Sequence, residues 1–332
     1  MTPSSVATAP PSSAASAAFR LNLPTSSPSD KQLAKPSRPA PVDVSPRWLL
    51  TAFAATLLLA VFCGYAALCL LFYQGQWQLI YQPSRAISDT PLRHGVPFDN
   101  FEFAVDEAGR PTLNGWYIPA DPGSKYATAT VLYLHDARGS LSDCLPALLA
   151  LHATGINVFA FDYRGFGFSS GAHPTERLAT EDSVAAWTYL TDLRHIPPRN
   201  LVVFGDGVGA TFAAHLAAQF APAGVILEDP NPPARQILLS DARARIVPLW
   251  LLQTEKLDPA SDLATAHVPR LFLNVRNPRG APNPRGAGAL GSDPTRALFE
   301  ASFYPKQYVD LHSAPASAIT TTLQRFFDDV LH

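Results

Sequence analysis

The order of apolar and polar positions divides the chain into four parts. Residues 1–46 are rich in Ser, Ala and Pro, with few large apolar residues. We expect a disordered tail there, because such a composition buries too little surface to fold, and a transit peptide is the alternative. Residues 48–73 carry no charge and exceed the roughly 20 apolar residues of a membrane-spanning helix. Residues 74–99 are then a juxtamembrane linker, and residues 100–332 form one domain.

From residue 100 on, short apolar strands alternate with helices. Continuous apolar runs of this kind are typical of strands buried on both faces. The expected strands are 101–105, 112–118, 130–135, 156–161, 201–204, 224–228, 271–275 and 307–311, and the expected helices are 141–154, 174–193, 210–220 and 315–331. This alternation predicts an α/β fold, a doubly wound and mostly parallel eight-stranded sheet. The Pro- and Gly-rich residues 276–294 indicate a long loop insertion.

Basic residues around the apolar run bear on its orientation. Those before it are Lys31, Lys35, Arg38 and Arg47, and those after it are Arg85 and Arg93. This excess before the run favours a single-pass helix with a cytoplasmic tail and an extracytoplasmic domain. A buried helix or a cleaved signal peptide fits less well, given the length of the run. The linker, from Trp77 on, either lies along the membrane surface or packs as a connector.

Charge and cysteine content exclude several classes of protein. The net charge of −2 is too small for an electrostatic nucleic-acid surface. Cys63 and Cys69 lie in the apolar run, which leaves Cys144 alone in the domain and allows no disulfide within it. No Cys/His cluster has the spacing of a zinc site. We therefore expect no cofactor, no metal and no nucleic-acid partner.

The most informative stretch is Gly205-Asp206-Gly207-Val208-Gly209, which we call the elbow. It follows the apolar run 201–204 and opens the helix 210–220. A strand, a tight Gly-rich turn and a helix are the context of the nucleophile elbow G-x-S-x-G. Here Gly207 stands where the nucleophilic serine would be, between the small residues Gly205 and Gly209.

Asp206 is the alternative nucleophile, since a carboxylate can attack. With Asp206 at the centre, however, Phe204 and Val208 would occupy the two positions that require small residues. We therefore read Asp206 as an exposed polar flank of the elbow. Glu228, Asp229 and the loop serines Ser169 and Ser170 offer no substitute, because none lies on the elbow.

Two further loops follow predicted strands, where ligands of such sheets sit. One begins His135-Asp136-Ala137, and the other is Asp162-Tyr163-Arg164-Gly165-Phe166-Gly167. With the elbow, this series resembles the α/β-hydrolase superfamily over residues 77–331. It is most similar to the branch of membrane-anchored, single-span serine hydrolases that includes lysophospholipase-like and depalmitoylase-like proteins.

The resemblance implies two backbone N–H donors for an oxyanion. One would come from the segment near Asp136 or Ala137, and the other from Val208, the residue after the nucleophile position. The family's usual His-Gly is replaced here by His135-Asp136. A carboxylate at that point would place negative charge where an oxyanion forms, which opposes stabilisation of the transition state.

The resemblance also places an acid and a base. The acid normally follows the strand 271–275, where this chain has Asn274 and no carboxylate up to Pro278. Asp293 could return to the site, or could instead cap the helix expected at 295–303. Without gaps the base would fall near Ala316, so His312 is either a base in a shifted register or a surface histidine.

These departures together indicate a degenerate catalytic triad. The sequence predicts a membrane-anchored pseudo-hydrolase that binds a small apolar ligand, a lipid or a partner protein. One alternative is an active hydrolase of carboxylic or lysolipid esters with a displaced nucleophile. Another is a cell-envelope scaffold that acts through the Pro-rich tail.

Overall fold

A computed structural model describes residues 45–171, 173–275, 294–311 and 315–331. The chain comprises two units, residues 1–56 and 57–332. The described part of the first unit is the beginning of helix α1 (Pro46–Gly75), and the second unit holds the sheet. The expected disordered tail, up to residue 44, and the expected loop insertion, up to residue 293, lie outside the described residues.

Helix α1 covers the uncharged run and extends it by two residues at each end. It is the one helix in the described part of the chain that is long and apolar enough to cross a membrane. Its side chains, including those of Leu58, Val61 and Phe62, are largely exposed. In this respect α1 differs from a core helix of a soluble protein, which is apolar because it is buried.

One sheet of eight strands forms in the order β10-β9-β8-β7-β4-β6-β3-β2. The strands are β2 (Asp99–Val105), β3 (Pro111–Ile118), β4 (Tyr126–Leu134), β6 (Ile156–Asp162), β7 (Leu201–Asp206), β8 (Gly224–Glu228), β9 (Arg270–Asn274) and β10 (Lys306–Asp310). Strand β3 pairs antiparallel with β2 and β6, and the other pairs are parallel. The predicted eight-stranded, mostly parallel sheet is confirmed.

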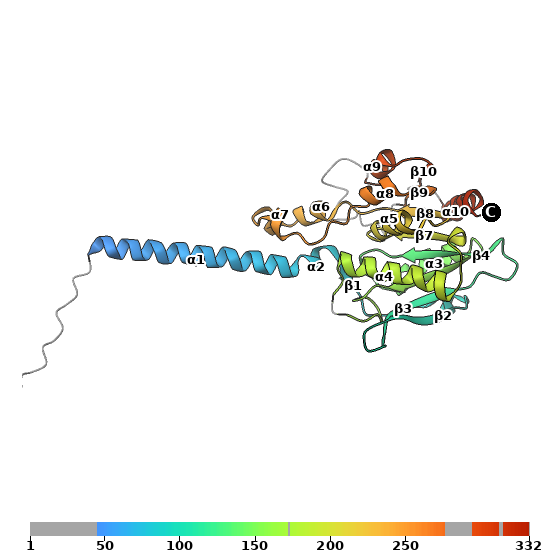
Figure 1. The fold of residues 1–332 in the computed structure, drawn as a ribbon, viewed down its shortest axis with the longest axis horizontal. Helices are drawn as coiled ribbons and strands as arrows, with labels where there is room; N and C mark the ends of the chain where they lie inside the picture. The colour runs from blue at the N-terminus through green and yellow to red at the C-terminus, as the bar shows by residue number, and fades with distance from the viewer. Residues whose placement is uncertain (1–44, 172, 276–293, 312–314, 332) are drawn as a thin grey trace, which may run out of the picture. The chain divides into compact units, whose positions relative to one another are not determined.

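Helices cover both faces of this sheet (Figure 1). The α-helices after α1 in the described residues are α2 (Trp77–Ile80), α3 (Leu141–His152), α4 (Glu176–Thr188), α5 (Gly209–Phe220), α6 (Ala234–Leu239), α7 (Leu249–Leu252), α8 (Ala260–Thr265), α9 (Pro294–Ala301) and α10 (Ala316–Val330). The sequence patterns did not reveal α6, α7 and α8. These have 6, 4 and 6 residues, too few to show a helical period of apolar positions.

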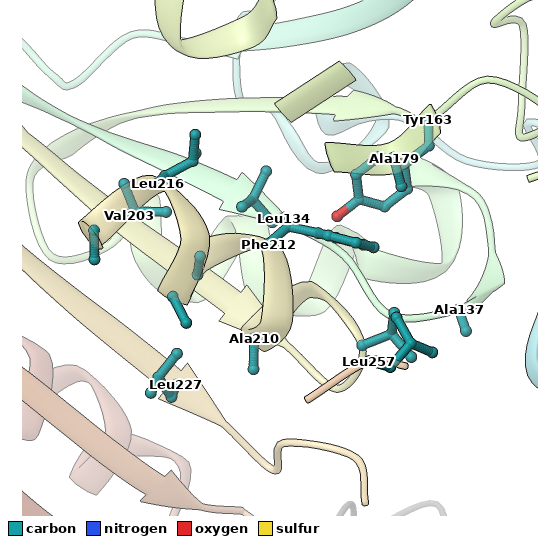
Figure 2. Close-up of a cluster of buried hydrophobic side chains, with 14 of the residues drawn as sticks. Leu134, Ala137, Tyr163, Ala179, Val203, Ala210, Phe212, Leu216, Leu227 and Leu257 are labelled. Atoms are coloured by element: carbon teal, nitrogen blue, oxygen red, sulfur yellow. The ribbon is translucent and has the colours of Figure 1, made fainter. Parts of the chain in front are cut away.

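Alternate side chains of each parallel strand enter different core layers, as the pleat requires. Val203 packs in the layer of α4 and α5, whereas Val202 and Phe204 pack in the layer of α3 and α10. Figure 2 shows part of the first layer, where Phe212 of α5 lies over strands β4 and β7. Both faces of the strands are therefore buried, which is why they appear as unbroken apolar runs in the sequence.

The loop after β6 is held by polar contacts of its own motif. Asp162 accepts a hydrogen bond from Leu141 N at 3.0 Å, at the start of α3. Arg164 donates through its backbone N–H and its Nε to Asp182 of α4. Ser169 is buried, with 1% of its surface exposed, and accepts a hydrogen bond from Asn114 N at 2.9 Å. This motif therefore fixes a loop rather than presenting a reactive group.

The linker after α1 packs onto the domain. Ile80 and Tyr81 are buried in the core, and Trp77 stacks on His173 with ring centroids 5.0 Å apart. The short strand β1 (Gln82–Pro83) then pairs with β5 (Arg138–Gly139). These contacts favour the packed connector over a segment that lies along a membrane surface.

Helix α5 begins in very close contact with β4. A Cβ atom on Gly209 would overlap the carbonyl oxygen of Leu134, and one on Gly205 would lie 2.5 Å from Gly209 O. Both flanking glycines of the elbow are therefore required sterically, because no other residue lacks a Cβ.

We expect Gly209→Ala to lower the free energy of unfolding by about 1–3 kcal/mol, the usual cost of an overpacked core site. Gly75→Ala is the matched control, because a Cβ there meets nothing within 4 Å. Thermal unfolding of the detergent-solubilised full chain measures both. Equal melting temperatures for the two variants would contradict the close approach.

Candidate active site

The elbow lies between β7 and α5, at the carboxyl end of the central strand. Gly207 has a φ of +57°, a left-handed conformation that glycine adopts most readily. Its N–H donates to Glu228 O at 3.0 Å, and its carbonyl accepts from Asn231 N at 3.3 Å. The turn is thus fixed by backbone contacts to β8 and the segment that follows it, with no side chain at its tip.

The carboxylate of Asp136 fills the space over Gly207. A Cβ built on Gly207 would overlap the Asp136 side chain, whose own Cβ lies 2.9 Å away. Asp136 Oδ1 accepts hydrogen bonds from Val208 N at 3.0 Å and from Asn231 Nδ2 at 3.0 Å. The position that a nucleophilic side chain would need is therefore taken by another residue of the same chain.

The two implied oxyanion donors have different surroundings. The N–H of Val208 is already bonded to Asp136. Ala137 is 3% exposed, and its carbonyl accepts from Gln82 N at 2.7 Å. The structure thus brings Asp136 and Val208 together at Gly207, but the N–H of Val208 serves an internal carboxylate.

The buried His135 side chain contacts the backbone of Asp136. It is fully buried, and its Nδ1 lies 2.6 Å from the carbonyl oxygen of Asp136. Burial lowers the pKa of His135 to about 4, so the ring is neutral near pH 7. Nδ1 therefore carries the proton and donates to the Asp136 carbonyl, which orients the residue over the elbow.

Asp206 differs from its expected role. It is partly buried, not an exposed flank, and accepts a hydrogen bond from Tyr133 Oη at 3.1 Å. Burial, with a smaller contribution from the negative charge of Asp136, raises the pKa of Asp206 to about 8. Asp206 is therefore protonated near neutral pH, which makes it a poor nucleophile.

The acid and base positions are only partly described. Asp293 and His312 both lie outside the described residues. The structure does bring a carboxylate to the end of β9, because Asp229 Oδ1 accepts from Val275 N at 3.0 Å. Asp229 directly follows the neighbouring strand β8, which is why inspection of the residues that directly follow β9 missed it.

Sequence reasoning also missed Asn231 and Tyr133. Asn231 lies in the run Asp229-Pro230-Asn231-Pro232-Pro233, which matches no catalytic motif. Tyr133 is an inward-facing residue of β4 and looks like an ordinary core aromatic. Only the pairing of β4, β7 and β8 shows that they reach Asp136 and Asp206.

No metal-binding arrangement is present in the part of the chain that the structure describes: no three His, Cys, Asp or Glu side chains are placed to hold an ion. A cavity of about 370 Å³ lies between α3 and the turn 91–94. Its lining includes Asp89, His94 and Ser142, none of which belongs to the elbow. It is therefore separate from the site around Gly207.

Comparison with known proteins agrees with the fold. A family model described as the alpha/beta hydrolase fold matches residues 131–296, which include the elbow and the loop of Asp136. The chain belongs to the α/β-hydrolase family. An uncharacterized protein of Mycobacterium tuberculosis is 28% identical over 204 residues, which cover 61% of this chain and 70% of that protein.

Two other comparisons concern a human relative of this α/β-hydrolase-fold chain and a solved structure. The human alpha/beta hydrolase domain-containing protein 17B is 30% identical over 128 residues, covering 38% of this chain and 43% of the human protein. The solved structure of the Pyrococcus furiosus esterase Pf2001 has a TM-score of 0.56 at 18% identity, over 76% of this chain and 99% of that one. The latter likeness shows a shared fold.

The raised pKa of Asp206 predicts a pH-dependent stability. The folded protein keeps this proton up to about pH 8, whereas the unfolded chain loses it near the ordinary value of 3.8. The stabilisation is therefore complete below about pH 4 and declines as the pH rises toward 8. In Asp206→Asn this decline is absent, so the melting temperature should fall by several degrees less between pH 5 and 9.

Thermal unfolding of the full chain in detergent at a series of pH values measures this difference. Glu107→Gln is the matched control, because Glu107 is exposed in a turn and its replacement should leave the slope unchanged. If Asp206→Asn shows the wild-type slope, Asp206 does not hold the proton.

Proposed function

We propose that this chain is a membrane-anchored α/β-hydrolase-fold protein that has lost serine-hydrolase catalysis. In this proposal its fold binds a small apolar ligand, a lipid or a partner protein at the membrane. The observation that carries the proposal is the Asp136 carboxylate, which occupies the space over Gly207 and accepts the Val208 N–H.

The chemistry of acyl transfer explains why this arrangement argues against catalysis. The reaction needs an attacking group and donors that stabilise the oxyanion as it forms. Gly207 supplies no attacking group, and the Val208 N–H is occupied. An anionic carboxylate at contact distance would repel the developing oxyanion, so the site disfavours the transition state that related enzymes stabilise.

A displaced nucleophile has little support from the same contacts. Asp206 holds its proton near neutral pH and is bonded to Tyr133. Asp136 directs Oδ1 at both nearby donors, Val208 N and Asn231 Nδ2. If Asp136 attacked an ester, these donors would be bonded to the attacking oxygen and not to the oxyanion.

The membrane part of the proposal rests on α1 and on the charges around it. The helix is long, uncharged over residues 48–73 and exposed over most of its length, which suits contact with lipid. The basic residues before it favour a cytoplasmic tail. The proposed topology therefore places the domain on the extracytoplasmic side.

We expect no labelling of the purified full chain by a fluorophosphonate probe, because no activated serine stands at the elbow. Gly207→Ser should also stay unlabelled, since its side chain would overlap Asp136. In-gel fluorescence measures the labelling, beside an active serine hydrolase in the same reaction. Stoichiometric labelling of the wild-type chain would refute the loss of catalysis.

A double-mutant cycle tests the contact itself. We expect Gly207→Ser to lower the free energy of unfolding by about 1–3 kcal/mol through overlap with Asp136. Combined with Asp136→Gly it should cost less than the sum of the two single changes, by 1 kcal/mol or more. The exposed Asp121 gives the control: Asp121→Gly should add to Gly207→Ser without coupling. Additive effects in both pairs would show that Asp136 does not lie over Gly207.

The topology is tested by cysteine accessibility in intact cells that express the full chain. Cysteine at Glu107, which is exposed in the turn between β2 and β3, should react with a membrane-impermeant maleimide. Cysteine at Ser12 in the tail should react only after permeabilisation. The reverse pattern would invert the orientation, and equal reaction at both sites would argue against a spanning helix.

A further inference from the structure

The segment between α6 and α8 exposes an unusual set of apolar side chains. Ile246, Trp250 and Leu251 are 63%, 84% and 65% exposed. Their neighbours Val247 and Leu249 are buried in the core. Scattered exposed apolar residues are common, but three within six residues form a surface that water solvates poorly. We call residues 246–251 the apolar ridge.

Hydrogen bonds hold the apolar ridge beside the second half of α1. Tyr65 Oη donates to the carbonyl oxygen of Ile246 at 3.2 Å. Immediately after α1, Gln76 donates through Nε2 to Leu252 O at 2.8 Å and accepts from Thr254 N at 3.3 Å. Gln76 is 1% exposed. These contacts hold the start of the ridge at Tyr65 and the residues just after the ridge at Gln76.

The position of Tyr65 along α1 gives the depth of the ridge. The uncharged run 48–73 is about 39 Å long at 1.5 Å per residue, and a bilayer has a hydrocarbon core of about 30 Å. With the run centred in the core, Tyr65 lies roughly 7 Å from the centre and roughly 8 Å inside the edge nearer the domain. Ile246, bonded to Tyr65, is then in the outer part of the acyl chains, within the roughly 5–10 Å to which interfacial segments insert their apolar side chains.

Charges beside the ridge suit the same location. Arg243 and Arg245 are exposed in the turn η4 (Ala242–Arg245), which directly precedes the ridge. Asp241 pairs with Arg243 and leaves a net positive charge. Tryptophan with arginine, next to exposed aliphatic side chains, is the composition of segments that lie in the headgroup region.

We propose that the apolar ridge is a second membrane contact, which inserts its exposed apolar side chains just below the headgroups of the leaflet from which α1 emerges. This inference rests on the proposed membrane-spanning role of α1. The ridge and α1 together hold the domain in one orientation, because two separate contacts remove most of the freedom that a single helix leaves. The occupant of the ridge is a phospholipid surface.

Depth-dependent quenching in vesicles of phosphatidylcholine and phosphatidylglycerol tests this contact. Full chains with one cysteine each carry an environment-sensitive NBD fluorophore, and the quenchers are phospholipids with a nitroxide either near the headgroup or deep in an acyl chain. The positions are Trp250→Cys in the ridge, native Cys63 in α1, and Tyr304→Cys. Tyr304 is 81% exposed. It precedes β10 and so lies at the amino ends of the parallel strands, the opposite end from the ridge.

We expect the lipid nitroxide to reduce NBD emission about twofold or more at Trp250→Cys and to leave Tyr304→Cys unchanged, with Cys63 quenched by nitroxides deeper in the acyl chains. If Cys63 is quenched but Trp250→Cys behaves as Tyr304→Cys does, the ridge contact is wrong and the anchor stands. If Cys63 is not quenched, the anchor fails and the ridge contact with it. Cross-linking between Trp250→Cys chains without lipid quenching would assign the ridge to a second copy and overturn the proposal.

Discussion

The close contact between the backbones of α5 and β4 is the constraint on which the elbow depends. Gly209 can begin α5 against the carbonyl of Leu134 only because neither it nor Gly205 carries a Cβ. This contact fixes the angle at which β7 turns into α5, and therefore the left-handed conformation of Gly207. The backbone geometry of a nucleophile elbow is thus retained by packing that is independent of the residue at its tip.

The same contact explains how Asp136 reaches the elbow. The chain leaves β4 at Leu134, against the first turn of α5. The next residues, His135 and Asp136, therefore pass over the elbow at Gly207. With no side chain on Gly207, the carboxylate settles on the Val208 N–H and on Asn231. The backbone donor at the start of α5 therefore contacts a carboxylate of the chain itself.

The sheet could be predicted because strands buried on both faces leave continuous apolar runs, and the elbow because its glycines have fixed spacing. The sequence also pointed to a negative charge from Asp136 near the oxyanion position. It could not show that this side chain lies over Gly207, nor that Asn231 and Tyr133 take part, because those contacts join strands distant in sequence. The burial of Asp206 was missed for the same reason. Asp293 and His312 lie outside the described residues.

The pairing of β1 with β5 has a mechanical consequence. Gln82 N donates to Ala137 O at 2.7 Å, and Ser84 N donates to Gly139 O at 2.8 Å. Two backbone hydrogen bonds thus clamp the segment that leaves α1 and α2 to the loop that carries Asp136. A displacement of this segment would therefore act directly on the loop of Asp136. The loop that places Asp136 over Gly207 and the N-terminal helix are thus mechanically coupled.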